Sequence, residues 1–89
     1  MPSDVDLRGL IVDIIDEFSE KDCKTFLFLL GDDVPKRMRD KELVEVFEIL
    51  MNRGRITQTD CSYLIKILER MKLTSLAYKV ALFETRKSL

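Results

Sequence analysis

The sequence has no histidine and no tryptophan, and it has only two cysteines, three glycines and two prolines among its 89 residues. The lack of histidine excludes a His-based catalytic relay, and two cysteines without histidine are too few ligands for a zinc site of the usual ligand number. Two cysteines are too few for the disulfide framework of a small secreted domain, so we expect reduced thiols in the cytoplasm. The glycines stand far apart, at positions 9, 31 and 54, which excludes a glycine-rich phosphate loop.

Long apolar runs are also missing. The longest uncharged apolar run covers residues 25–30, far below the roughly 20 residues that a membrane-spanning helix needs. Asp4 and Asp6 lie where a secretory signal needs a basic start and an apolar core. The composition, 46% apolar and 35% charged, is typical of a folded globular chain. We therefore expect a single domain over residues 1–89 that does not contact a membrane.

The charges are unevenly distributed, although the net charge is only −1. Residues 1–33 contain nine acids and three bases, hence −6, whereas residues 34–89 contain seven acids and twelve bases, hence +5. If the fold separates these segments, this division favours asymmetric contacts between copies or related domains over binding to a polyanion. The equal alternative is that both sets of charges are simply solvated surfaces.

Apolar residues recur every three or four positions, and no alternating strand pattern of useful length interrupts them. We therefore expect an all-α fold of six short antiparallel helices. The first helix is predicted over residues 4–17, with Ser3 as its N-cap. Ser19 and Asp22 form a predicted capping box that starts the second helix, which ends at Gly31 because glycine readily adopts the left-handed conformation at helix ends.

The helical pattern fails between residues 31 and 40. Pro35 disfavours helix at the residue before it, so we expect a short third helix or a loop in this segment. The fourth helix is predicted to start after an Asp40 cap and to end near Gly54. Its apolar repeat consists of Leu43, Val44, Phe47, Leu50 and Met51.

The last two helices also carry cap signals. Thr57 with Asp60 is a predicted capping box for the fifth helix, which runs to about residue 71. Thr74 is the predicted cap of the sixth helix, which ends before a polar tail at residues 84–89. The residues expected to face inward are Cys61, Leu64, Ile65, Ile67, Leu68, Leu76, Ala77, Val80 and Phe83.

No group of residues has the pattern of a catalytic site. Cys23 and Cys61 both fall at predicted inward positions, where a small apolar thiol is the usual role, and neither has a histidine to activate it. Asp32 and Asp33 follow a helix-ending glycine without a second acidic pair at a suggestive spacing. We expect no enzymatic activity, no cofactor and no metal.

Two short basic segments, residues 36–39 and 53–55, would form a basic rim if the fold brings them together. We interpret Lys36, Arg37 and Arg39 as part of a protein-docking surface. A nucleic-acid-binding helical domain is the alternative. The isoelectric point of about 5.4 and the absence of aromatic residues between the bases argue against it.

Several features in this order resemble a death effector domain. They are six predicted helices of this length, the basic third element, and two runs: Phe-Leu-Phe-Leu-Leu-Gly-Asp-Asp-Val-Pro at residues 26–35 and Leu-Glu-Arg-Met-Lys-Leu at residues 68–73. The resemblance covers about residues 6–86 and is closest to the tandem domains of apoptotic initiator caspases and FLICE-like inhibitory proteins, including viral ones. It implies a six-helix antiparallel death-fold bundle, in agreement with the helical pattern.

The resemblance also implies contact residues on the second helix. The family's Phe-Leu pair, which enters a groove on the partner domain, matches Phe28 and Leu29. At about 100° per residue, Phe28 points about 200° from Phe26, so the five apolar residues 26–30 cannot all face inward. We expect Phe28 to be an exposed contact residue. The alternative is that Phe28 and Leu29 belong to the core.

A second implied feature is the family's charge triad, in which an acid on the second helix meets an Arg-x-Asp-Leu sequence at the junction of the last two helices. Asp22, Arg70 and Leu73 match this pattern, but Lys72 stands where the second acid belongs. If Arg70 and Lys72 share Asp22, a surplus positive charge remains. For this sequence, the resemblance therefore implies neither that the usual network forms nor that the choice of partner is the usual one.

The resemblance implies a non-catalytic module that recruits or regulates death-fold partners in apoptotic signalling. The partners would be adaptor, initiator caspase and inhibitory chains, or other copies of the same domain in open asymmetric stacks. The division of charge along the chain independently suits asymmetric contacts. The alternative within the same fold is a caspase-recruitment or pyrin domain in inflammatory signalling.

Overall fold

The computed structural model describes residues 4–34 and 42–88. These two stretches form five α-helices, one 3-10 helix and no strand, which confirms the all-α prediction. The elements are α1 (Asp4–Glu17), α2 (Glu20–Leu30), η1 (Gly31–Asp33), α3 (Leu43–Asn52), α4 (Ser62–Arg70) and α5 (Thr74–Ser88). The third helix or loop expected at residues 31–40 lies mostly outside the described residues, so the count of six helices stays a prediction.

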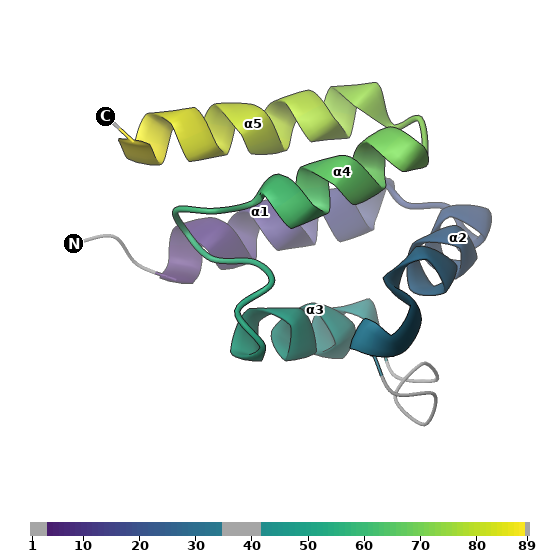
Figure 1. Ribbon diagram of the computed structural model, residues 1–89. Coiled ribbons are helices and arrows are strands. Elements are labelled where there is room, and N and C mark those ends of the chain that lie inside the picture. Colours follow the sequence, from purple (N-terminus) through teal and green to yellow (C-terminus); the bar gives the residue numbers. More distant parts are fainter. Residues whose placement is uncertain (1–3, 35–41, 89) are drawn as a thin grey trace.

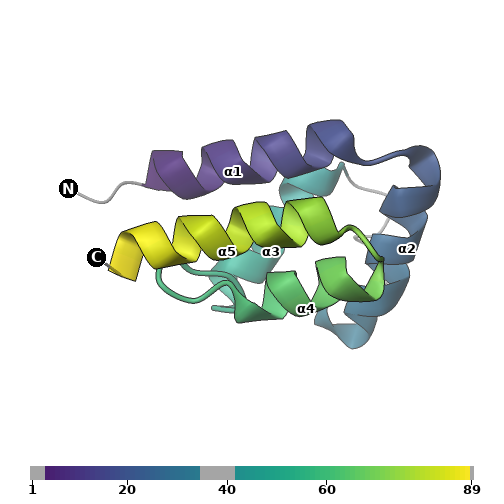
Figure 2. The same ribbon diagram turned by 90° about the horizontal axis from the view of Figure 1, so that it is seen from above.

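The helices pack in two layers, and α2 lies across one end of them. α4 and α5 run antiparallel along each other and are joined by a tight turn (Figure 1). α1 lies beside α5 on the far side from α4, and α3 lies beneath them (Figures 1 and 2). α2 crosses the end of the bundle at which α4 turns into α5. The start of α1 and the end of α5 lie together at the opposite end.

The core is built from one apolar face of each helix. Phe26 of α2 is fully buried between two other rings: its centroid lies 5.1 Å from that of Phe47 on α3 and 5.4 Å from that of Phe18. Burying such a side chain contributes about 1.5–3 kcal/mol. No polar or charged side chain of the described residues is buried. The aromatic stack therefore fixes the orientation of α2 on the core.

The first two helices follow the sequence predictions. α1 covers the predicted range, residues 4–17. The Ser19 hydroxyl accepts the N–H of Asp22 at 3.1 Å, and the Asp22 carboxylate accepts the N–H of Ser19 at 3.0 Å, which confirms the capping box. Gly31 closes α2 with a φ of 56°, a conformation that glycine adopts without the steric cost of a Cβ atom.

α3 differs from its prediction at its start. The first carbonyl that accepts an intrahelical bond is that of Glu42, from the N–H of Val46 at 3.2 Å. The helix therefore begins at Leu43, and the prediction of Asp40, which lies outside the described residues, as its cap is wrong. Val46 is buried, whereas Val44 is exposed because it stands at the edge of the buried stripe.

α4 also begins later than predicted. Thr57 Oγ1 accepts the N–H of Asp60 at 2.9 Å, but the bond back to the Thr57 N–H, at 3.1 Å, comes from the Asp60 carbonyl and not from its carboxylate. The predicted capping box is therefore wrong in its second half. The Asp60 carboxylate instead accepts the N–H of Ser62, the first helical residue, at 3.1 Å. The N–H of Cys61 donates to the Glu84 carboxylate of α5 at 2.5 Å.

α5 is longer than predicted. The carbonyl of Leu73 accepts the N–H of Ala77 at 3.0 Å, so Thr74 occupies the first helical position and is not the cap. The helix continues to Ser88, and the prediction of a polar tail from residue 84 is wrong. Of the residues expected to face inward, Leu76, Ala77 and Val80 are buried, and Phe83 packs against the core.

Candidate protein-interaction surface

Phe28 has the largest exposed fraction among the large apolar side chains that the structure describes, at 80%. Leu29 beside it is 37% exposed, whereas Phe26 and Leu30 on the same helix are buried. Because Phe26 and Leu30 point into the core, helical geometry turns Phe28 outward. The predicted exposure of Phe28 is confirmed, and its role as a contact residue stays a prediction.

Two lysines accompany Phe28 on the outer face of α2. Lys21 and Lys24 are exposed and stand seven and four residues before Phe28, on the same side of the helix. Neither forms an ion pair with a described residue. We call Lys21, Lys24, Phe28 and Leu29 the α2 surface. It places two exposed cations beside two exposed apolar side chains.

A shallow apolar groove of about 60 Å³ lies between α1 and α3. Val12 and Val44 are 49% and 48% exposed on these two helices. The groove is completed by Ile11, Phe47 and Met51. The Arg8 guanidinium and the Glu48 carboxylate, 3.8 Å apart, join the same two helices. Sequence analysis missed this groove, because a half-exposed valine gives the same helical spacing as a buried one.

An ionic network fixes the chain directly after α2. Asp33 Oδ1 lies 3.1 Å from Nη2 of Arg55, and the Tyr63 hydroxyl donates to the other carboxylate oxygen of Asp33. The Arg55 guanidinium lies 5.9 Å from the centroid of the Tyr63 ring. Burial and the hydrogen bond to Asp33 raise the pKa of Tyr63 to about 12. The network ties η1 to the loop before α4 and to α4 itself, and so holds the end of the α2 surface in place.

The residues matched to the family's charge triad do not form that triad. The Asp22 carboxylate is held by the backbone of Ser19, and no ion pair among the described residues joins Asp22 to Arg70. Arg70 and Lys72 are exposed, and Leu73 is half-buried against the core. Among the described residues, the two positive charges of Arg70 and Lys72 therefore have no carboxylate partner at the junction of α4 and α5.

Lys72 has an unusual backbone conformation. Its φ of 64° is the one positive value found for a non-glycine residue in the described stretches. The N–H of Lys72 donates to the carbonyl of Glu69, and the N–H of Leu73 donates to the carbonyl of Leu68, each at 2.9 Å. This pair of bonds is the Schellman motif, which glycine usually closes.

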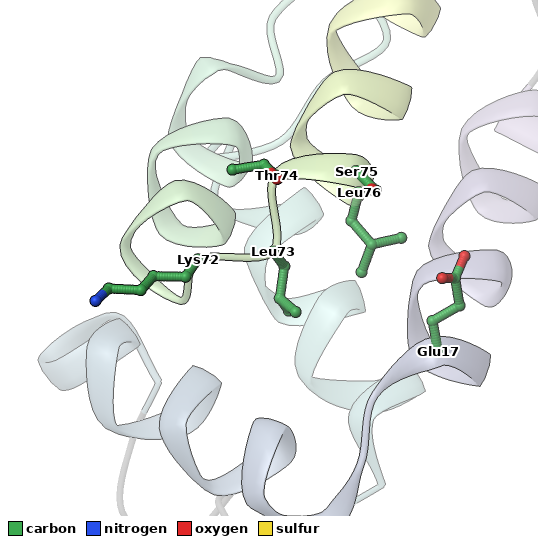
Figure 3. Close-up of a pocket in the computed structure, with 6 residues that line it drawn as sticks. All are labelled: Glu17, Lys72, Leu73, Thr74, Ser75 and Leu76. Carbon is green, nitrogen blue, oxygen red and sulfur yellow. The ribbon is translucent and has the colours of Figure 1, made fainter.

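A shallow pocket of about 180 Å³ adjoins this junction. Figure 3 shows Leu73 and Leu76 on one side and Glu17 of α1 on the other, while the Lys72 ammonium group points away. The Glu17 carboxylate lies 3.5 Å from Nζ of Lys79. The carboxylate that lines this pocket is therefore already engaged in a surface ion pair and lies beside apolar side chains, an arrangement not suited to acid–base chemistry.

The Cys61 thiol is buried and poorly suited to nucleophilic chemistry. Burial, followed by the nearby carboxylates of Glu84 and Asp60, raises the pKa of the Cys61 thiol to about 11, so it stays protonated at neutral pH. Within residues 4–34 and 42–88, no three metal-ligating side chains gather in one place. In the same stretches, no helix combines the length and the apolar character needed to cross a membrane.

The structure describes only one of the two basic segments, residues 53–55. Lys36, Arg37 and Arg39, predicted to be part of the docking surface, lie outside the described residues. In the second segment, Arg53 is exposed and Arg55 is paired with Asp33. The predicted rim formed by both segments therefore stays a prediction.

The family model for the death effector domain matches residues 7–86. This range includes the α2 surface, the groove between α1 and α3, and the junction of α4 and α5. No curated protein and no solved structure matches the chain. The family match agrees with the resemblance carried by residues 26–35 and 68–73. The chain belongs to the death effector domain family, whose members are non-catalytic protein-interaction domains.

Proposed function

We propose that this domain binds other death effector domains through Phe28 and Leu29 and thereby recruits or regulates adaptor, initiator caspase or inhibitory chains in apoptotic signalling in the cytoplasm. The observation that carries the proposal is the 80% exposure of Phe28 on a helix fixed at both ends. The Ser19 capping box holds its start, and the Asp33 network follows its end. A rigid, exposed aromatic side chain is the kind of residue that dominates binding energy at interfaces.

The groove between α1 and α3 supports an asymmetric mode of contact. One chain carries both a projecting apolar anchor, Phe28, and an apolar groove bordered by Val12 and Val44. A contact between two different surfaces of the same domain is heterologous, and it leaves one unused surface at each end of an assembly. Such a contact lets several domains join in an open stack, and Lys21 and Lys24 would meet acidic residues at its rim.

Two other partner classes compete with this proposal. Caspase-recruitment and pyrin domains share the death fold, but membership of the death effector domain family favours partners of the same family. A nucleic acid needs a continuous basic surface, whereas Arg55 is committed to Asp33 and the chain has an isoelectric point of about 5.4.

The partner class is tested by a binding assay of residues 1–89 against death effector, caspase-recruitment and pyrin domains and a random-sequence RNA, at low and high salt. We expect saturable binding to at least one death effector domain, with part of the affinity kept at high salt because Phe28 is apolar. Preferential binding to another death-fold class, or to the RNA, would contradict the proposal.

A further inference from the structure

The last turn of α2, which carries Phe28 and Leu29, is held by the residues that follow it. The N–H of Gly31 donates to the carbonyl of Phe28 and closes the helix. η1 comes next, and the backbone bond that closes it, from the N–H of Val34 to the carbonyl of Gly31, is 3.4 Å long. This distance exceeds the usual range of about 2.7–3.2 Å. The backbone of η1 is therefore weakly bonded here, and side-chain contacts gain weight in setting its position.

Asp33, the last residue of η1, supplies such contacts. Its two carboxylate oxygens have different partners: Oδ1 lies 3.1 Å from Nη2 of Arg55, and Oδ2 accepts the hydroxyl of Tyr63. The side chain of Asp33 is only 23% exposed, and hydrogen bonds to an ionised group are stronger where water is partly excluded. A carboxylate bound on both oxygens has little freedom to rotate, so the network fixes the direction in which η1 leaves α2.

The two partners of Asp33 belong to parts of the fold that are fixed independently of α2. The N–H of Arg55 donates to the carbonyl of Leu50 at 2.9 Å, in the Schellman motif that follows α3. Tyr63 lies in the first turn of α4, next to the fully buried Leu64. The network therefore connects the end of α3 and the start of α4 to η1 and, through η1, to the last turn of α2.

We propose that Arg55 and Tyr63 are positioning residues for the α2 surface. They act through Asp33: by fixing η1 they set the place of Phe28 and Leu29, so the affinity for a partner depends on two side chains outside the α2 surface. A contact residue that is already in place loses less conformational freedom on binding, which raises the affinity. This inference rests on the proposed contact through Phe28, but it predicts a loss of affinity in chains whose Phe28 is intact.

Tyr63→Phe tests the proposal, because it removes the hydroxyl that Asp33 accepts and keeps the ring. We expect calorimetric titration with a death effector domain partner to show a loss of affinity of about fivefold, within the range that a single hydrogen bond contributes. Tyr78→Phe is the matched control, since it removes a hydroxyl from an exposed tyrosine on α5 and should bind normally. Arg55→Gln should also weaken binding, whereas Arg53→Gln, the same loss of charge two residues earlier, should not.

A double-mutant cycle separates positioning from direct contact with the partner. If Tyr63 acts through Asp33, the Asp33→Ala variant loses affinity, and adding Tyr63→Phe to it produces no further loss. Amide hydrogen exchange provides a second measurement. In the Tyr63→Phe variant, exchange should become faster at Gly31, whose N–H donates to the carbonyl of Phe28, and should stay unchanged across α1 and α5.

A loss of affinity in Tyr63→Phe supports the positioning role if both controls bind normally, the cycle shows no further loss and faster exchange is confined to the end of α2. Unchanged affinity in Tyr63→Phe, while Phe28→Asp abolishes binding, overturns this inference alone and leaves the proposed function standing. Additive losses in the cycle also overturn it, because Tyr63 then contacts the partner itself. Equal losses in a control, or faster exchange in every helix, overturn it as well. Unchanged binding of Phe28→Asp would contradict the proposed function and this inference together.

Discussion

Lys72 occupies the same position after α4 that Gly54 occupies after α3. Their φ angles are 64° and 76°, and both residues close a Schellman motif. In the Gly54 motif, the N–H groups of Gly54 and Arg55 donate to the carbonyls of Met51 and Leu50, at 3.0 and 2.9 Å. A Cβ atom in this conformation costs about 1–2 kcal/mol. The chain therefore keeps a lysine where the backbone favours glycine, which is a pattern associated with functional positions.

We expect Lys72→Gly to raise the free energy of unfolding by about 1 kcal/mol, because glycine relieves the strain of the left-handed conformation. Urea denaturation of the variant and the wild type measures the difference. Lys72→Ala is the control: it removes the same charge but keeps a Cβ atom, and we expect no such gain. Equal gains from glycine and alanine would assign the effect to charge and contradict the strain account.

The converse substitution provides a second check on the same motif. We expect Gly54→Ala to lower the free energy of unfolding by about 1 kcal/mol. No atom outside the chain neighbours lies within 4 Å of a Cβ placed at Gly54. A loss measured by urea denaturation therefore reports backbone strain and not a clash. A stability equal to that of the wild type would contradict the strain account.

Asp22 and Arg70 should contribute to stability independently. We expect Asp22→Ala to cost about 1 kcal/mol by removing half of the Ser19 capping box, and Arg70→Ala to cost less than about 0.5 kcal/mol as a surface change. The double variant should equal their sum within about 0.5 kcal/mol. A coupling energy well above that value would show an Asp22–Arg70 pair and restore the family's triad.

Tyr63 should ionise late. The pKa of Tyr63 in the folded state is raised from 10 to about 12. At a pH between these two values, Tyr63 therefore keeps its proton in the folded state and has lost it in the unfolded chain. Its contribution to stability is therefore complete below pH 10 and is lost as the pH rises toward about 12.

The titration of Tyr63 is followed by phenolate absorbance in a Tyr78→Phe background, where Tyr63 is the remaining tyrosine of the two in the chain. Asp33→Asn removes the carboxylate that accepts the Tyr63 hydroxyl. We expect this change to lower the midpoint toward 10, although burial keeps part of the shift. A midpoint that does not move would exclude Asp33 as a cause of the raised pKa.

The groove between α1 and α3 is tested by Val44→Lys. Val44 is 48% exposed, so we expect the free energy of unfolding to change by less than about 0.5 kcal/mol, while the binding of a partner's apolar anchor is lost. Leu82→Lys on α5 is the matched control, because Leu82 has a similar exposure of 45%. Calorimetric titration with a death effector domain partner should show normal binding for this control. Equal losses in both variants would remove the groove from the interface.

The sequence predicts the parts of this fold that depend on neighbouring residues. The Ser19–Asp22 capping box, the range of α1 and the outward direction of Phe28 all follow from helical spacing within a few positions. The misplaced helix starts have a different cause. α4 begins where Glu84, 23 positions later, accepts the N–H of Cys61, and nothing in the local sequence marks that bond.

The candidate site likewise has a part that the local sequence predicts and a part that depends on tertiary packing. Phe28 and Leu29 are evident from the helix that carries them, but the network of Asp33, Arg55 and Tyr63 joins three separate elements. The groove beside Val44 depends on how α1 packs on α3. The turn at Lys72 could not be predicted from the sequence either, because lysine disfavours the left-handed backbone conformation found there. Only the backbone hydrogen bonds of Lys72 and Leu73 reveal the Schellman motif.

The central claim is that Phe28 is a contact residue and not part of the core, and Phe28→Asp tests it most directly when unfolding and partner binding are measured on the same preparation. We predict a free energy of unfolding within about 0.5 kcal/mol of the wild type and a loss of affinity of at least about thirtyfold, the scale of a binding hot spot. Tyr78→Asp, at an aromatic side chain that is 66% exposed on α5, is the control and should bind normally. Unchanged affinity for the death effector domain partner, or a loss of several kcal/mol in stability, would contradict the claim.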